Sequence, residues 1–66
     1  MERNLRLDWQ SIVQEAINRR KNQHLTQEQL AVLIGISKPT LNHFEQGKLS
    51  ISLEKAIRIL KFLGLS

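Results

Sequence analysis

At 66 residues, the chain is expected to form a single domain, residues 1–66, with a core of modest size. Its 41% apolar residues include no run long enough to span a bilayer and no signal-peptide core, and the absence of cysteine excludes disulfides and thiolate metal sites. A cytoplasmic protein is therefore expected, and the net charge of +4 suits an anionic partner such as nucleic acid.

A first helix is predicted over residues 9–22. Asp8 can cap its start, and five apolar residues recur at the spacing of one helical face: Trp9, Ile12, Val13, Ala16 and Ile17. Arg20 returns to that apolar side, where a charge needs a partner. Arg19 belongs to the last turn, where a solvated cation complements the helix dipole.

A second helix is predicted over residues 27–34. Thr26 and Gln29 have the spacing of a capping box, in which each side chain bonds the backbone of the other residue. The apolar side of this helix consists of Leu30, Leu33 and Ile34. Gly35 then ends it, because glycine enters the left-handed conformation of a helix C-terminus without steric cost.

A third helix, predicted over residues 38–46, follows almost at once. Ser37 can cap it, and Pro39 falls in the first turn, where the missing N–H of proline is harmless. Leu41 and Phe44 give it an apolar side, and Gly47 ends it. Two helices joined by so short a turn must cross at a steep angle, which is the helix-turn-helix arrangement.

A joint pattern spans these two short helices. It comprises Leu25-Thr26-Gln27, Leu30-Ala31, Gly35-Ile36-Ser37, Leu41 and Phe44-Glu45-Gln46-Gly47-Lys48. In this order and spacing, the residues resemble the phage-repressor-like helix-turn-helix domains of the XRE/Cro type. The resemblance implies an all-α, compact four-helix bundle of the lambda-repressor-like DNA-binding type, with a fifth helix left open.

A fourth helix is predicted over residues 53–63, after a start at Ser52. Its core side is expected to hold Leu53, Ala56, Ile57, Leu60 and Leu63, which leaves Phe62 on the far side and Ile59 at the edge. Phe62 could join Ile59, Leu49, Ile51 and Leu65 in an exposed apolar patch that serves a dimer or another partner. The alternatives are an ordinary exposed residue and cover by the N-terminal segment.

The resemblance also implies how the third helix would read DNA. Base contacts from the major groove are expected from its N-terminal part, which places Lys38, Pro39, Thr40, Asn42 and His43 at base edges. Lys38 can donate to guanine or to a phosphate, and Pro39 can make only apolar contact.

Further roles follow from the same family positions. Phosphate contacts are expected from Gln27, Ser37, Lys48 and Ser50, while Arg20 is expected to form a structural ion pair with Glu45. Residues 1–7 are compatible with a frayed end or with a basic arm that carries Arg3 and Arg6. No cofactor, metal site or catalytic residue is expected, since the sequence has no paired carboxylates, no phosphate loop and no ligand cluster.

The function expected from these observations is a sequence-specific regulator of transcription that binds double-stranded DNA, a repressor acting as a homodimer on a two-fold related operator. It would be bacterial or phage-encoded. An alternative within the same resemblance is an antitoxin, which represses its own operon and also binds a toxin protein. A third alternative is a scaffold that binds only protein, which predicts no salt-sensitive DNA affinity.

Overall fold

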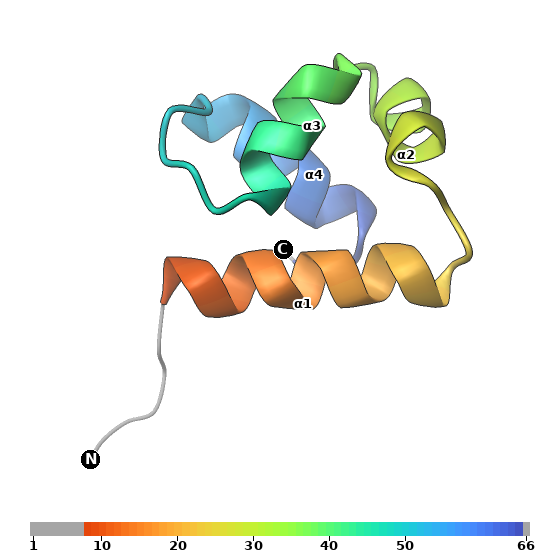
Figure 1. The fold of residues 1–66 in the computed structure, drawn as a ribbon, viewed down its shortest axis with the longest axis horizontal. Coiled ribbons are helices and arrows are strands. Elements are labelled where there is room, and N and C mark those ends of the chain that lie inside the picture. Colours follow the sequence, from red (N-terminus) through yellow and green to blue (C-terminus); the bar gives the residue numbers. More distant parts are fainter. Residues whose placement is uncertain (1–7, 66) are drawn as a thin grey trace.

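The computed structural model describes residues 8–65, and this part of the chain is all-helical. The four helices are α1 (Trp9–Asn22), α2 (Gln27–Ile34), α3 (Lys38–Glu45) and α4 (Leu53–Phe62) (Figure 1). The all-α prediction is confirmed, with α3 and α4 each one residue shorter at the C-terminal end than the sequence pattern indicated. The expectations for Arg3 and Arg6 lie outside the described residues.

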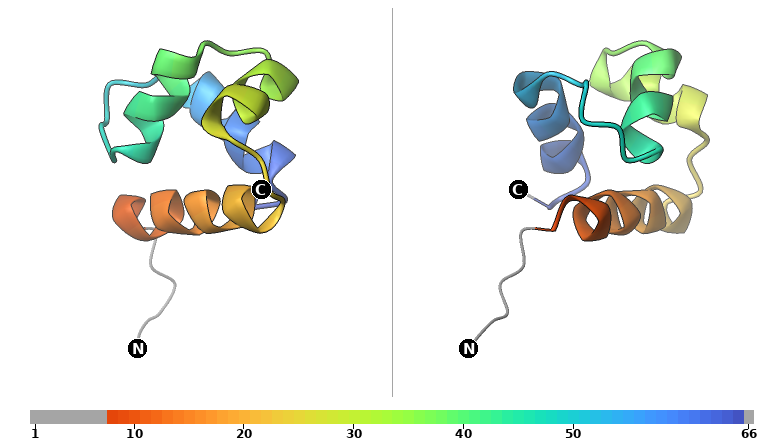
Figure 2. Two further views of the ribbon diagram at one scale, coloured as in Figure 1. Left: turned by 45° about the vertical axis from the view of Figure 1, so that its right-hand side comes forward. Right: turned by 60° about the vertical axis from the view of Figure 1, so that its left-hand side comes forward.

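The helices divide into one long helix and a group of three short ones. α1 runs along one side of the molecule, and α2, α3 and α4 gather on the other, as the different views agree (Figure 2). α2 and α3 are joined by a tight turn and cross steeply, so they form the expected helix-turn-helix. α4 lies behind α3 in the view of Figure 1.

Side chains at the helix starts account for the helix boundaries. The Asp8 carboxylate accepts from the Gln10 amide at 3.2 Å, and Thr26 and Gln29 complete the predicted capping box. Ser52 caps α4 by accepting from the Lys55 amide at 3.2 Å. Such caps satisfy backbone donors that no helical carbonyl can reach.

The turn between α2 and α3 depends on one glycine. Gly35 ends α2 in the left-handed conformation with a φ of +86°, and its amide donates to the Ala31 carbonyl. Another positive φ, 58°, occurs at His24 in the connection between α1 and α2. His24 is the one residue with a positive φ in the described range that is not a glycine. Histidine tolerates this conformation better than most residues do.

The core lies where α1 meets the helix-turn-helix and α4. The largest fully buried side chains are Leu30, Leu41, Phe44 and Ile59, one or more from each of the three short helices. From α1, the Trp9 ring packs edge-on against Phe44, with ring centroids 5.6 Å apart and an interplanar angle of 88°. This is a favoured geometry for aromatic pairs, so it fixes the start of α1 against α3.

The prediction for the inner face of α4 was partly wrong. Ile59 is fully buried, whereas Leu53 is 75% exposed and Ile57 is 40% exposed. The apolar stripe of α4 is wider than the surface that its neighbours cover, so periodicity alone could not locate its buried edge. Ala56 and Leu63 are buried, as expected.

The predicted apolar patch is not continuous in the structure. Ile59 belongs to the core, and Ile51 and Leu65 pack partly buried against it. Leu49 and Phe62 are exposed, but Leu49 lies in the loop before α4 and Phe62 is the last residue of that helix. The five residues therefore do not share one exposed surface, because α4 turns Ile59 inward.

Arg19 is not a solvated helix end, contrary to the expectation. Its Nη1 donates to the carbonyls of Leu63 and Gly64 at 3.1 and 3.2 Å, and its Nε pairs with Glu15 at 3.3 Å. These carbonyls stand at the C-terminal end of α4, where helical partners are lacking. Arg19 therefore fastens the end of α4 to α1.

Arg20 and Glu45 form a desolvated ion pair between α1 and the end of α3. Arg20 Nε donates to Glu45 Oε2 at 2.7 Å and Nη2 donates to Oε1 at 3.0 Å, so both carboxylate oxygens are held. The side chains are only 11% and 8% exposed. The third donor, Nη1, binds the Leu25 carbonyl at 2.8 Å. The pair thus joins α1, α3 and the connection that leads into α2.

We expect Glu45→Ala to lower the free energy of unfolding by about 3 to 5 kcal/mol, because it leaves a buried guanidinium without a counter-charge. Urea denaturation followed by circular dichroism measures this. Glu15→Ala is the matched control, since it breaks an exposed pair whose side chains are 41% and 50% exposed and should cost less than about 1 kcal/mol. Equal losses in the two variants would contradict the structural importance of the buried pair.

Candidate nucleic-acid interface

The outer side of α3 is a polar ridge. Leu41 and Phe44 point into the core, and the opposite side of the helix presents Lys38, Pro39, Asn42 and His43, all exposed. Pro39 lies at the middle of this ridge, with Asn42 towards α2 and His43 towards the loop that leads to α4. Four of the five predicted base-reading residues are therefore accessible on one side of one helix.

The fifth predicted base-reading residue, Thr40, is half-buried and engaged locally. Its hydroxyl lies 2.7 Å from the Ser37 hydroxyl, and its backbone amide donates to the same Ser37 oxygen at 3.2 Å. Ser37 is thus the N-cap of α3. This structural role is separate from the phosphate contact expected of Ser37.

A hollow lies on each side of the ridge. The first is lined by Gln27 at the start of α2 together with Lys38, Pro39 and Asn42 of α3. The second lies between α3 and the start of α4 and is lined by Thr40, His43, Ser50, Ile51, Ser52 and Lys55. The ridge is therefore flanked by two recesses that carry hydrogen-bonding side chains.

Two residues of the second hollow, Ser52 and Lys55, were missed as site residues by the sequence reasoning. Ser52 was recognised only as a helix start, and Lys55 is a first-turn lysine with no motif of its own. The available signal was that only seven residues separate the end of α3 from the start of α4, which brings the first turn of α4 back to α3. Lys48 and Ser50, which were predicted, are exposed in the loop between the two helices.

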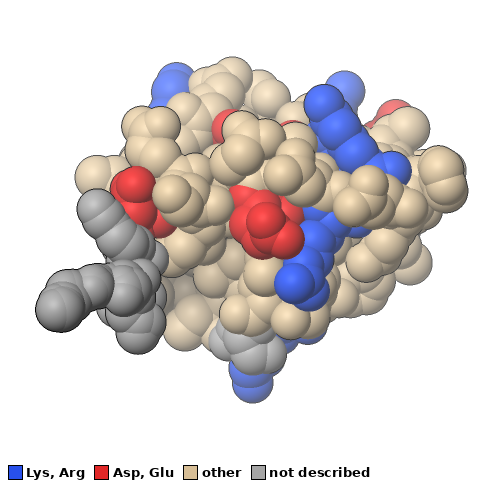
Figure 3. All heavy atoms as spheres, turned by 90° about the horizontal axis from the view of Figure 1, so that it is seen from below, with Lys and Arg blue, Asp and Glu red and all other residues tan. Residues whose placement is uncertain are grey.

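The interface carries unneutralised positive charge. Lys38, Lys48 and Lys55 make no ion pair with any residue in the described part of the chain, and the first turn of α3 has no acidic residue. By contrast, basic and acidic side chains are intermixed on the face seen from the α1 side (Figure 3). An anion would therefore be attracted to the α3 side more strongly than to the α1 side.

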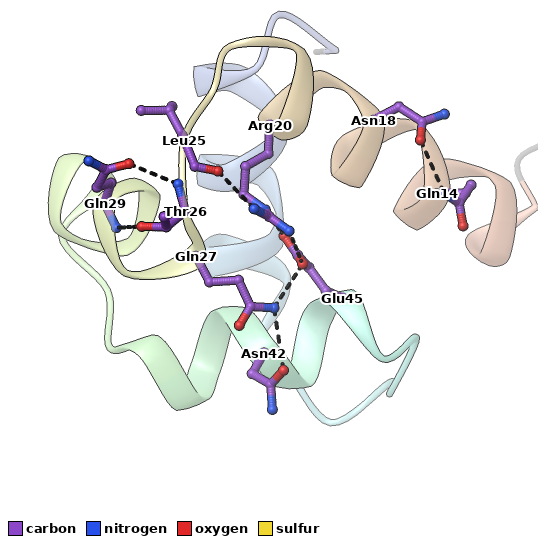
Figure 4. Close-up of polar contacts among 9 residues, drawn as sticks. All are labelled: Gln14, Asn18, Arg20, Leu25, Thr26, Gln27, Gln29, Asn42 and Glu45. Atoms are coloured by element: carbon purple, nitrogen blue, oxygen red, sulfur yellow. Dashed lines mark hydrogen bonds and ion pairs between the residues drawn. The ribbon is translucent and has the colours of Figure 1, made fainter.

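A chain of hydrogen bonds runs from the buried ion pair to this surface (Figure 4). Gln27 is half-buried, and its Nε2 donates to Glu45 Oε1 at 2.8 Å and to Asn42 Oδ1 at 3.3 Å. Arg20 holds the same Glu45 carboxylate from the other side. The first turn of α2, the middle of α3 and the end of α1 are thereby connected through polar side chains.

Within residues 8–65, no three His, Cys, Asp or Glu side chains cluster in a way that could hold a metal ion. No helix in the same range has the length and apolar character needed to cross a bilayer. The chemical groups around the exposed side of α3 are N–H and hydroxyl donors and the positive charges of lysines.

Comparison with known proteins agrees with this architecture. The sequence profile described as "Helix-turn-helix" matches residues 17–66, which include the last part of α1 and all of α2, α3 and α4. The chain is also similar to the uncharacterized HTH-type transcriptional regulator MJ0272 of Methanocaldococcus jannaschii, with 46% identity over 41 residues. That alignment spans 62% of this chain and 62% of the relative, so it covers less than two thirds of either. With three quarters of its length matched by the profile, the chain belongs to the helix-turn-helix family.

Proposed function

We propose that the chain is a sequence-specific DNA-binding regulator of transcription, a repressor that inserts α3 into the major groove of double-stranded DNA. The observation that carries the proposal is the exposed polar ridge of α3, flanked by two hollows and by lysines that have no ion-pair partner within residues 8–65. An α-helix fits the major groove of B-DNA, which is about 12 Å wide. The description of the similar Methanocaldococcus jannaschii protein as a transcriptional regulator supports the same role.

Base recognition would come from the ridge. Lys38 can donate to guanine O6 and N7, and His43 offers a ring nitrogen one turn further along the helix. Pro39, at the centre of the ridge, can only make apolar contact, for example with a thymine methyl group. Thr40 contributes less, because its hydroxyl is shared with Ser37.

Phosphate contacts would come from the flanks of the ridge. In the second hollow, Ser50, Ser52 and Lys55 surround the first turn of α4, whose leading amides have no helical partner. Lys48 stands in the loop beside them. Helix N-termini and lysines both favour phosphate, so this flank is suited to hold one strand of the DNA backbone.

A homodimer would give the proposed regulator its specificity. One α3 offers few base contacts, and two copies on half-sites about 34 to 36 Å apart would double them. Of the residues first expected at an interface, Leu49 and Phe62 remain exposed, and the structure adds Leu53 and Ile57 on α4. These residues are available to a second copy.

The antitoxin alternative is favoured by a different surface. The outer side of α2 has a hollow lined by Leu25, Thr26, Glu28, Gln29, Val32 and Leu33. Val32 is 74% exposed and Leu33 is 56% exposed, although Leu33 had been expected to face the core. Apolar surface of this kind is typical of protein contacts, so a toxin or another protein partner could bind there while α3 engages DNA.

Selection from random double-stranded DNA tests the proposed function. We expect recovery of a two-fold symmetric sequence, with His43→Ala relaxing the preference at one base position per half-site. Lys48→Ala should reduce the slope of log affinity against log salt concentration by about one and weaken all sequences alike.

Lys61→Ala is the matched control, because Lys61 is exposed in the last turn of α4 and lines neither hollow. It should leave the salt slope unchanged. Failure to enrich any sequence, together with weak binding at every salt concentration, would contradict DNA recognition and favour the protein-binding alternatives.

A further inference from the structure

His43 stands between the α3 ridge and the second hollow. It is exposed in the last turn of α3, and Lys55 lines the same hollow from the first turn of α4. Lys48 follows in the loop, and its backbone amide donates to the His43 carbonyl at 3.2 Å. The imidazole is therefore placed both beside the proposed base-reading residues and beside the proposed phosphate-binding flank.

No acidic side chain lines the second hollow. Besides His43 and Lys55, its lining residues carry no charge near neutral pH: Thr40, Ser50, Ile51 and Ser52. Glu45, two residues after His43, holds Arg20 in the buried pair. Glu54, next to Lys55, pairs with Arg58 at 2.9 Å. A protonated His43 would therefore add positive charge beside two lysines and gain no counter-charge from the hollow.

A DNA phosphate in the hollow would supply that counter-charge. An opposite charge within about 4 to 6 Å favours the charged form of a titratable group, whereas neighbouring lysines disfavour it. The complex with DNA therefore holds the proton more tightly than the free chain does, so protonation and DNA binding strengthen each other. The imidazolium also has two N–H donors, where the neutral ring has one donor and one acceptor. One donor can meet the phosphate while the other remains available to a base edge.

We propose that His43 binds DNA as an imidazolium, so that the chain takes up a proton with its operator and binds more tightly as the pH falls through the neutral range. This inference rests on the proposed function and gives His43 a charge-bearing role in addition to the expected base contact. The direction follows from linkage. Because the complex holds the proton more tightly, affinity is highest where the imidazole is protonated and decreases as the pH rises through the titration of the complex.

Affinity for the selected operator, measured at about pH 6 and about pH 8, tests the inference, since histidine is the side chain that ordinarily titrates between them. For the wild type, we expect binding at least about fivefold tighter at the lower pH for each chain on the DNA, which a tenfold difference in proton affinity between the free and bound states would produce. The slope of log affinity against log salt concentration should also be steeper by about one per chain at the lower pH, because one more phosphate is neutralised.

Two substitutions of His43 separate its charge from its other contacts. His43→Gln keeps hydrogen-bonding groups but carries no charge, so its affinity and salt slope should be nearly the same at both pH values. His43→Arg is charged throughout and should keep the steeper salt slope at both. The His43 side chain is exposed, so neither change disturbs the core.

The matched control is His24, the other histidine of the chain. It is exposed in the connection between α1 and α2 and lines neither hollow beside the ridge. Asparagine also tolerates the positive φ at this position, so His24→Asn should fold normally and keep the pH dependence of the wild type.

The outcomes distinguish this inference from the function on which it rests. Loss of the pH dependence in His43→Gln but not in His24→Asn supports the proton uptake. The proton uptake is overturned, while the proposed function stands, if the wild type binds its operator equally well at both pH values, if His43→Gln keeps the dependence, or if His24→Asn removes it. If the wild type selects no operator and shows no salt-sensitive binding at either pH, both fail.

Discussion

The structure depends on the neutralisation of one buried arginine. A desolvated guanidinium is costly unless its charge and its donors are satisfied, and Arg20 achieves this with both oxygens of Glu45 and the carbonyl of Leu25. Arg20 and these two partners belong to three different parts of the chain: α1, α3 and the connection that leads into α2. A domain of 66 residues has little core to spare, so this one constraint sets how α1 meets the helix-turn-helix.

The same interaction links stability to recognition. The Glu45 carboxylate, which neutralises Arg20, also accepts a hydrogen bond from the Gln27 amide. The same Gln27 nitrogen donates to Asn42 on the exposed side of α3. A polar group that would otherwise rotate freely is thereby given a preferred direction before any DNA arrives. Such preorganisation reduces the ordering cost of binding. In our account, the buried ion pair and the recognition surface of this small domain are therefore connected through one set of hydrogen bonds.

Local signals explain which parts of the fold could be predicted. Caps such as the Thr26–Gln29 box and the glycine stop at Gly35 act within a few residues, so the helix bounds and the helix-turn-helix were predicted to within one residue. The burial of Ile59 and the exposure of Leu53 depend on how much of α4 its neighbours cover, which periodicity does not contain. Likewise, Lys55 enters the candidate interface only because α4 begins beside α3, and the direction of the Asn42 amide requires coordinates.

The central claim is that the α3 ridge and its two hollows form the DNA-contacting surface. A titration of the isotope-labelled chain with a selected duplex, followed by amide chemical shifts in NMR spectra, tests it most directly. Our account predicts the largest shifts in residues 38–43 and in the segment from Lys48 to Lys55, and small shifts on the outer side of α2. Shifts concentrated instead around Val32 and Leu33, with the α3 ridge unchanged, would contradict it.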